Sequence, residues 1–233
     1  MKTNGKTKRR GGLSPDKYLS EPQIGRLLLY LERRAAAGGR RAAVNRFIVI
    51  MLLYCGLRAE ELLSLRLRNL PGYHGKNAIE VERGKGGVAR AVQVPDWLTE
   101  YIAAFVKSCR KGAKPGGILI PSERGYRRVV VKRARVVNGR RIHGQRTERS
   151  CRMTYHSLWA KVRRIGLAAG IGKLHPHMFR HTYLSRLYNV KQDLRFVQDQ
   201  AGHLDPKTTA IYTRTNVDER TRQVQDLPRP FAS

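Results

Sequence analysis

Acidic residues are scarce in this chain of 233 residues: 17 Asp and Glu stand against 47 Lys and Arg, a formal net charge of +30. Apolar residues still make up 41% of the sequence, which is enough to build a core and excludes a disordered basic tail. A folded protein with this much positive charge is expected to bind a polyanion, which indicates a nucleic-acid-binding protein.

Cysteines and long apolar runs are also lacking. The three cysteines, Cys55, Cys109 and Cys151, show no C-x-x-C spacing, which excludes a disulfide framework and a cysteine-based zinc finger. The longest apolar run, residues 47–55, is far shorter than the ~20 residues that cross a bilayer. No apolar segment follows the basic N-terminus, so neither a secretory signal nor membrane association is predicted.

The first third of the chain has the pattern of helices. Ser20 is a suitable helix cap and Pro22 suits a first turn, so a helix is predicted from there to the glycines at 38–39. A second helix is predicted over 41–55, and its apolar residues Phe47, Ile48, Met51 and Leu52 are expected in the core. A short third helix is predicted from Ala59.

A small sheet and further helices are predicted after it. Residues 78–82 and 88–94 alternate apolar and polar side chains, and the glycine-rich residues 83–87 between them suit a hairpin turn. The fold class predicted is mixed α+β, mostly helical, with a small antiparallel sheet. The remaining elements expected are helices over 96–111, 154–169, from Pro176 onward and 193–200, and a short strand over 118–120.

Two segments are strongly basic. Residues 1–12 contain five Lys and Arg and no acid, and are predicted to be a basic arm that follows a phosphate backbone. Residues 122–152 contain eleven Lys and Arg and two acids, and fit either a basic β-ribbon lying against nucleic acid or a loop. The nucleic-acid contacts predicted there are Arg127, Arg128, Lys132, Arg133, Arg135, Arg140 and Arg141.

Five scattered residues together suit attack on a phosphodiester. Planar guanidinium groups bind the charged oxygens of a phosphoryl transition state, and Arg58 and Arg180 are the candidates. Tyr212 is a candidate nucleophile, and Lys85, in the hairpin turn, could protonate the leaving oxygen. His177 lies three residues before Arg180, so both are expected on one helical face.

Each of these residues has an ordinary structural explanation when taken alone. Arg58 could cap a helix or pair with Glu61, and Lys85 could be a solvated turn residue. His177 and His181 have the i,i+4 spacing of metal ligands, but no H-E-x-x-H pattern or paired cysteine accompanies them, so no metal site is predicted. The joint occurrence of these residues in one order favours the catalytic interpretation.

In that order the residues resemble the motifs of the tyrosine recombinase (phage integrase) family, over about residues 13–215. The intervals of 3, 23 and 9 residues between the last four positions also fit the family's pattern. The matching positions are Arg58-x-x-Glu61, Lys85, His177-x-x-Arg180, Gly202-His203 and Tyr212.

The resemblance implies a tyrosine-recombinase-like catalytic domain that cleaves and rejoins DNA through a 3′-phosphotyrosyl intermediate with a free 5′-hydroxyl. Neither ATP nor metal nor any other cofactor is expected. By this resemblance the catalytic residues are Tyr212 as nucleophile, Arg58 and Arg180 as phosphate clamp, Lys85 as general acid, His177 as acid/base and His203 as hydrogen-bond donor, with Glu61 supporting the site.

The resemblance also implies partners and an organisation. The partner expected is double-stranded DNA, with further protomers in a tetrameric synapse, in DNA integration or recombination of a mobile element. The location expected is the cytoplasm, in association with DNA. Residues 1–19 cannot form the N-terminal DNA-binding domain usual in the family, so we expect either a catalytic fragment or a minimal enzyme. Our hypothesis is that the basic segment 122–152 is an insertion that partly replaces that domain, and 216–233 is expected to form a C-terminal tail.

Two alternatives stand beside the recombinase. A type IB topoisomerase-like enzyme shares the fold and the arginine, lysine and tyrosine chemistry, but releases and reseals one strand. A non-catalytic DNA-binding protein of the same fold, or a basic ribonucleoprotein component, explains the charge equally well. Neither non-catalytic protein needs the complete residue set, whose presence favours an enzyme.

Overall fold

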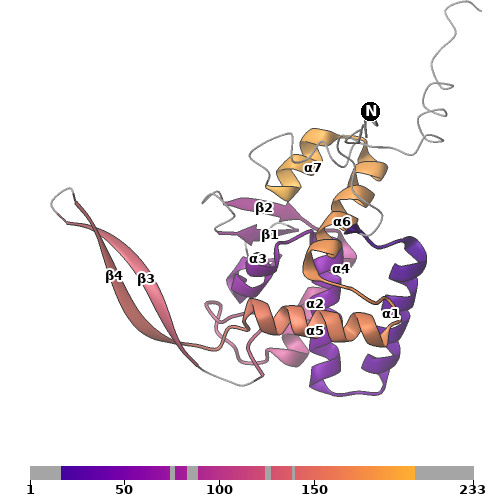
Figure 1. Ribbon diagram of the computed structural model, residues 1–233, viewed down its shortest axis with the longest axis horizontal. Helices are drawn as coiled ribbons and strands as arrows, with labels where there is room; N and C mark the ends of the chain where they lie inside the picture. The colour runs from indigo at the N-terminus through magenta and orange to yellow at the C-terminus, as the bar shows by residue number, and fades with distance from the viewer. Residues whose placement is uncertain (1–16, 74–76, 83–88, 124–126, 138–139, 203–233) are drawn as a thin grey trace, which may run out of the picture.

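The computed structural model describes residues 17–73, 77–82, 89–123, 127–137 and 140–202, with only the backbone between 127 and 150. Helices surround a large hydrophobic core, a small antiparallel sheet lies beside them, and a two-stranded ribbon extends away from the helical body (Figure 1). The predicted mostly helical α+β fold with a small antiparallel sheet is confirmed. The predicted arm 1–12 and tail 216–233 lie outside the described residues.

The N-terminal part is helical, as its pattern predicts. Its elements are α1 (Glu21–Ala36), α2 (Arg40–Cys55), α3 (Ala59–Ser64) and the short 3-10 helix η2 (Leu67–Asn69). The Ser20 hydroxyl accepts a hydrogen bond from the Gln23 N–H (3.4 Å), and the Gln23 side chain accepts one from the Ser20 N–H (2.9 Å). This reciprocal pair satisfies two N–H groups at the start of α1 and fixes where the helix begins.

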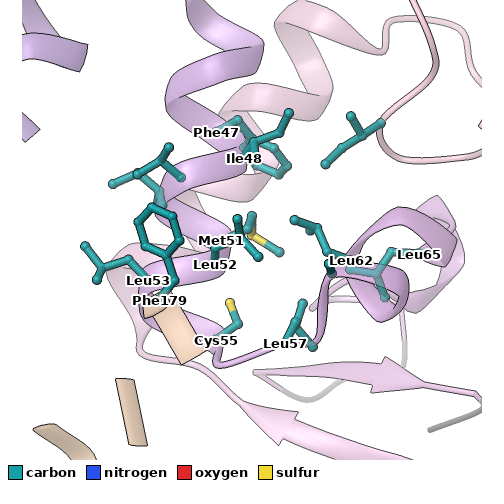
Figure 2. Close-up of a cluster of buried hydrophobic side chains, with 14 of the residues drawn as sticks. Phe47, Ile48, Met51, Leu52, Leu53, Cys55, Leu57, Leu62, Leu65 and Phe179 are labelled. Carbon is teal, nitrogen blue, oxygen red and sulfur yellow. The ribbon is translucent and has the colours of Figure 1, made fainter. Parts of the chain in front are cut away.

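Helix α2 forms the centre of the core. Phe47, Ile48 and Met51 are completely buried, and Figure 2 shows them among apolar side chains that include Phe179. Phe47 stacks on the Phe105 ring of α4 (Asp96–Cys109) with 3.6 Å between ring centroids. Since the buried residues of α2 all lie between Phe47 and Cys55, its C-terminal part is held in place by packing and leads into the arginine-rich region described below.

The small sheet pairs β1 (Ala78–Val81) with β2 (Arg90–Gln93) in the antiparallel sense predicted. Ile79 lies opposite Val92, and both are fully buried against the core. The predicted turn between the strands lies outside the described residues. The strand expected over 118–120 is wrong: Ile118 makes only an isolated bridge to Arg66, too short a pairing for a strand.

Three helices follow in the C-terminal part: α5 (Tyr155–Ala168), α6 (Pro176–Lys191) and α7 (Leu194–Ala201). The side chain of Asp193 caps α7 by accepting a hydrogen bond from the Phe196 N–H at 3.0 Å. Helix α6 packs on α2, and α7 packs on α6 and on β2. The C-terminal end of α7 is thereby brought beside the start of β2 and the end of α2.

The basic segment forms an antiparallel ribbon of β3 (Arg127–Val137) and β4 (Arg140–Ser150), which answers the question that its sequence left open. Figure 1 shows the ribbon extending away from the helices. Its base is fastened to the body by a bridge between Pro121 and Arg152 and by an ion pair between Glu123 and the buried Lys161 at 2.7 Å.

Within the described part of the chain, every helix is too short or too polar to cross a membrane.

Candidate active site

Arg58 stands in the turn between α2 and α3, directly after the chain reverses at Gly56. Gly56 has φ = 59°, a left-handed conformation that favours glycine, and a Cβ placed there would lie 2.2 Å from the ring of Tyr183. Tyr183 thus packs on the bare backbone of this turn. This close packing fixes the direction in which the chain leaves α2 toward Arg58.

Glu61 is the nearest partner of Arg58. The Glu61 carboxylate accepts hydrogen bonds at 2.8 Å from both the backbone N–H and the guanidinium Nη1 of Arg58. The backbone bond satisfies an N–H group at the start of α3, and the side-chain bond orients the guanidinium. Glu61 is 4% exposed, whereas the Arg58 side chain is 21% exposed.

A second arginine, Arg90 at the start of β2, binds the same carboxylate. Its Nη1 and Nη2 donate to the two oxygens of Glu61, each at 2.8 Å. Burial by itself would raise the pKa of Glu61, but the hydrogen bonds and charge of Arg90, with the bonds from Arg58, outweigh it and lower the pKa to about 2. Glu61 is therefore a carboxylate at any physiological pH.

Arg180 lies on the first turns of α6 and is 5% exposed. Its Nη1 donates to the carbonyl of Gly56 at 2.5 Å and its Nη2 to the carbonyl of Ala201 at 2.6 Å. One guanidinium thus ties the end of α2 to the end of α7.

The end of α7 contacts all three arginines through successive backbone carbonyls. The last carbonyls of a helix lack intrahelical partners and carry the negative end of its dipole, so they attract cations. Gly202, which ends the helix with φ = 62°, is packed so closely that a Cβ would lie 2.7 Å from Cδ of Arg90. The three bonds join Arg90 Nε to Gln200 O at 3.1 Å, Arg180 Nη2 to Ala201 O at 2.6 Å and Arg58 Nη2 to Gly202 O at 3.4 Å.

The resulting cluster, Arg58, Glu61, Arg90 and Arg180, combines three cations with one anion. Such a local excess of positive charge, held by backbone carbonyls, suits a phosphate better than a neutral ligand. Among the described residues, no group of three or more His, Cys, Asp or Glu side chains could hold a metal ion.

His177 lies beside this cluster, one turn before Arg180. Partial burial lowers its pKa, and the charges of Arg180 and Arg58 lower it further. The pKa of His181 falls to about 4, again chiefly through burial, with the neighbouring His177 and Arg180 adding to it. Both imidazoles are therefore neutral at pH 7, and a neutral imidazole can take up a proton.

The structure brings four of the predicted residues together: Arg58, Glu61, His177 and Arg180. The contact expected between Glu61 and Arg58 is present, while the catalytic roles of all four stay predictions. The other site predictions, Lys85, His203 and Tyr212, lie outside the described residues. The side chains of Arg127, Arg128, Lys132, Arg133, Arg135, Arg140 and Arg141 also lie outside them, although the backbone of their ribbon is described.

The sequence interpretation missed Arg90. A signal was available, because Arg90 falls in the apolar series of its alternating strand, two residues before the buried Val92. A single cation on the core face of a strand requires a buried partner. That partner, Glu61, was itself among the predicted residues.

The chain is similar to known proteins over most of its length. The model of the phage integrase family matches residues 17–219. Tyrosine recombinase XerD of Vibrio cholerae is 31% identical over 93% of this chain and 62% of its own length. Tyrosine recombinase XerA of Thermococcus kodakarensis is 29% identical over 78% of this chain and 54% of its own length.

Solved structures show the same fold. The crystal structure of XerA recombinase superimposes with a TM-score of 0.64 at 25% identity, over 91% of this chain and 66% of that one. The Tn1549 transposon integrase in complex with circular intermediate DNA gives a TM-score of 0.63 at 20% identity, over 92% of this chain and 66% of that one.

The chain spans about three fifths of the length of the XerD relative that it matches. The family match itself covers most of the chain and includes every element that carries the arginine cluster. The chain therefore belongs to the phage integrase family.

Proposed function

We propose that this chain breaks and rejoins DNA as the catalytic part of a site-specific recombinase, through a 3′-phosphotyrosyl intermediate. The observation that carries the proposal is the cluster of three arginines around one buried carboxylate, in a chain of the phage integrase family. Two of those arginines, Arg58 and Arg180, form the proposed phosphate clamp.

The proposed reaction exchanges one phosphodiester for another. The Tyr212 oxygen attacks the scissile phosphorus, a P–O bond to tyrosine forms, and the P–O bond to the 5′ oxygen breaks. His177 takes the tyrosine proton and Lys85 gives a proton to the leaving 5′ oxygen. Arg58 and Arg180, with His203 as a further donor, stabilise the charge on the non-bridging oxygens. Attack of a 5′-hydroxyl on the phosphotyrosine reverses the step, so no ATP or metal is consumed.

Double-stranded DNA is the proposed substrate. The net charge of +30 supplies the long-range attraction, and the β3–β4 ribbon supplies a basic extension about 35 Å long that a groove of B-DNA can accept. Strand exchange between duplexes further requires several protomers on DNA, and we propose a tetrameric synapse. The proposed location is the cytoplasm, in association with DNA.

The experiment that tests the proposal looks for the covalent intermediate. The protein is incubated with supercoiled plasmid and EDTA, quenched in detergent, and digested with nuclease to reveal a nucleotide-tagged protein on a gel. We expect an adduct with the wild type that is absent in Tyr212→Phe. Tyr155→Phe is the matched control, because Tyr155 is exposed and lies on α5, which carries none of the clustered arginines.

The remaining outcomes separate the alternatives. Relaxed plasmid without joint molecules between duplexes would indicate a type IB topoisomerase-like enzyme. DNA binding without any adduct would indicate a non-catalytic DNA-binding protein and would contradict the proposal. An adduct retained in Tyr212→Phe would contradict the assignment of the nucleophile.

A further inference from the structure

Arg90 is more deeply buried than Arg58, one of the two arginines assigned to the phosphate. Its side chain is 9% exposed, and all three of its side-chain nitrogens donate to protein oxygens. Two of them bind Glu61 as a bidentate pair, and the third binds the Gln200 carbonyl at the end of α7. A guanidinium bound in this way on three sides is directed at the protein, not at a substrate.

As a consequence of this arrangement, Arg58 and Arg90 share the carboxylate of Glu61. Each carboxylate oxygen accepts one bond from Arg58 and one from Arg90. The guanidinium of Arg58 therefore donates only one hydrogen bond to Glu61, from Nη1. Its Nη2 donates instead to the Gly202 carbonyl. Without Arg90, Glu61 would be a buried carboxylate with one cationic partner, and a bidentate pair would draw Arg58 onto it.

Arg90 also connects this carboxylate to α7. Its Nε bond to Gln200 is followed along the chain by the bonds from Ala201 to Arg180 and from Gly202 to Arg58. Three arginines from three separate segments thus share one short piece of backbone, so displacement of one strains the bonds of the others.

We propose that Arg90 is a positioning residue, which holds Glu61 and the end of α7 so that the Arg58 guanidinium faces the scissile phosphate. The proposal rests on the proposed function for the identity of the phosphate. Arg90 itself contacts neither the DNA nor the reacting atoms.

The first test separates positioning from binding. Three variants are compared with the wild type: Arg90→Gln, Arg90→Lys and the control Arg68→Gln. Arg68 suits as control because it also pairs with a carboxylate, that of Glu82 at 3.0 Å, but is 52% exposed and outside the cluster. Single-turnover adduct formation and the Kd for a fixed duplex are measured separately.

We expect Arg90→Gln to slow adduct formation by about 30-fold, because small displacements of a charge-stabilising group are costly. Its Kd should stay close to that of Arg68→Gln, and Arg90→Lys should recover part of the rate through its single ammonium. A rate equal to that of the control would overturn the proposal. So would a Kd that weakens as much as the rate, since Arg90 would then bind DNA directly.

A second test does not depend on activity. The pKa of the Glu61 carboxyl is followed by carbon NMR in the wild type, Arg90→Gln and Arg68→Gln. We expect it to rise above its value of about 2 only in Arg90→Gln. An unchanged pKa would show that Arg90 does not hold Glu61. If the wild type forms no adduct, the proposed function fails. This titration still shows whether Arg90 holds Glu61.

Discussion

At the scale of single residues, Glu61 is the carboxylate whose pKa depends on the arginines that bind it. It is the one carboxylate of the arginine cluster, and its four hydrogen bonds at 2.8 Å come from only two arginines. A buried carboxylate without such partners would take up a proton near neutral pH. The low pKa of Glu61 therefore measures how firmly Arg58 and Arg90 are held.

This pKa predicts a pH dependence of stability. The folded-state pKa of about 2 lies below the ordinary value of 4.5, so Glu61 stabilises the fold above about pH 4.5 and loses that contribution as pH falls toward 2. We expect Glu61→Gln to lower the free energy of unfolding by about 3 kcal/mol at pH 7, because it leaves a buried ion pair without its anion. Urea denaturation at stepwise pH measures the difference.

The difference between wild type and Glu61→Gln should be constant above about pH 5 and shrink below it. Glu80→Gln serves as control, since Glu80 lies on the other face of β1 from the core residues Ile79 and Val81. A difference that stays the same down to pH 2 would show that the charge of Glu61 contributes nothing.

At the scale of elements, the β3–β4 ribbon is the part of the fold that extends away from the helical body (Figure 1). Its eleven residue pairs run from Arg127 and Ser150 to Val137 and Arg140, and they place Arg128 directly opposite Arg149. Like charges directly opposite destabilise a strand pair, and a lone two-stranded hairpin is marginal in water. Both costs fall when an anionic partner lies along the ribbon, which supports DNA as that partner.

Removal of the ribbon tests this interpretation. Because Arg127 and Ser150 are paired, residues 128–149 can be replaced by a two-residue Asn-Gly turn without separating the strand ends. We expect the shortened protein to keep its thermal stability and to bind duplex DNA at least about tenfold more weakly, since fewer of its cations then reach phosphates. A fluorescence anisotropy titration measures the affinity.

A second variant keeps the ribbon and removes its charge. The seven predicted contacts Arg127, Arg128, Lys132, Arg133, Arg135, Arg140 and Arg141 are changed to Gln. If charge is what matters, this variant weakens binding as the deletion does. Unaltered affinity in both variants would refute a role of the ribbon in DNA binding.

At the scale of the whole molecule, the net charge determines how strongly the protein attracts a polyanion. An excess of +30 on 233 residues disfavours compactness, because the cations repel one another, and favours any polyanion that releases counterions on binding. Inside the structure the protein balances its cations locally, with helix-end carbonyls and Glu61 around three arginines. On the surface, ion pairs such as Arg68 with Glu82 balance only part of the excess, because the acids are outnumbered.

The charge predicts a steep effect of salt. Between 50 and 200 mM NaCl we expect the affinity for duplex DNA to fall at least about 1,000-fold, as for a protein that binds six or more phosphates. The slope of log Kd against log salt should become shallower by about 0.9 for each phosphate that the ribbon neutralises in the wild type. Equal slopes for wild type and deletion would mean that the ribbon touches no phosphate.

Much of this protein follows from sequence alone, because the relevant forces are local. Helix starts depend on caps such as Ser20 and on apolar spacing within a few residues, and the β1–β2 hairpin depends on alternation around a glycine-rich turn. The motif residues Arg58, Glu61, His177 and Arg180 could be selected on another ground, the order and spacing in which they occur along the chain.

Tertiary structure alone decided the rest, because it depends on pairs that are distant in sequence. The partner of Glu61 at Arg90 is 29 residues away, and the carbonyls of α7 meet Arg58 and Arg90 across more than 100 residues. Likewise, a basic segment becomes a ribbon only when its two strands find their register, which composition does not specify. The sequence determined which residues are predicted to carry the chemistry, and the packing of α7 against α6 and β2 decided how the described ones are held, because only packing brings distant hydrogen-bonding groups together.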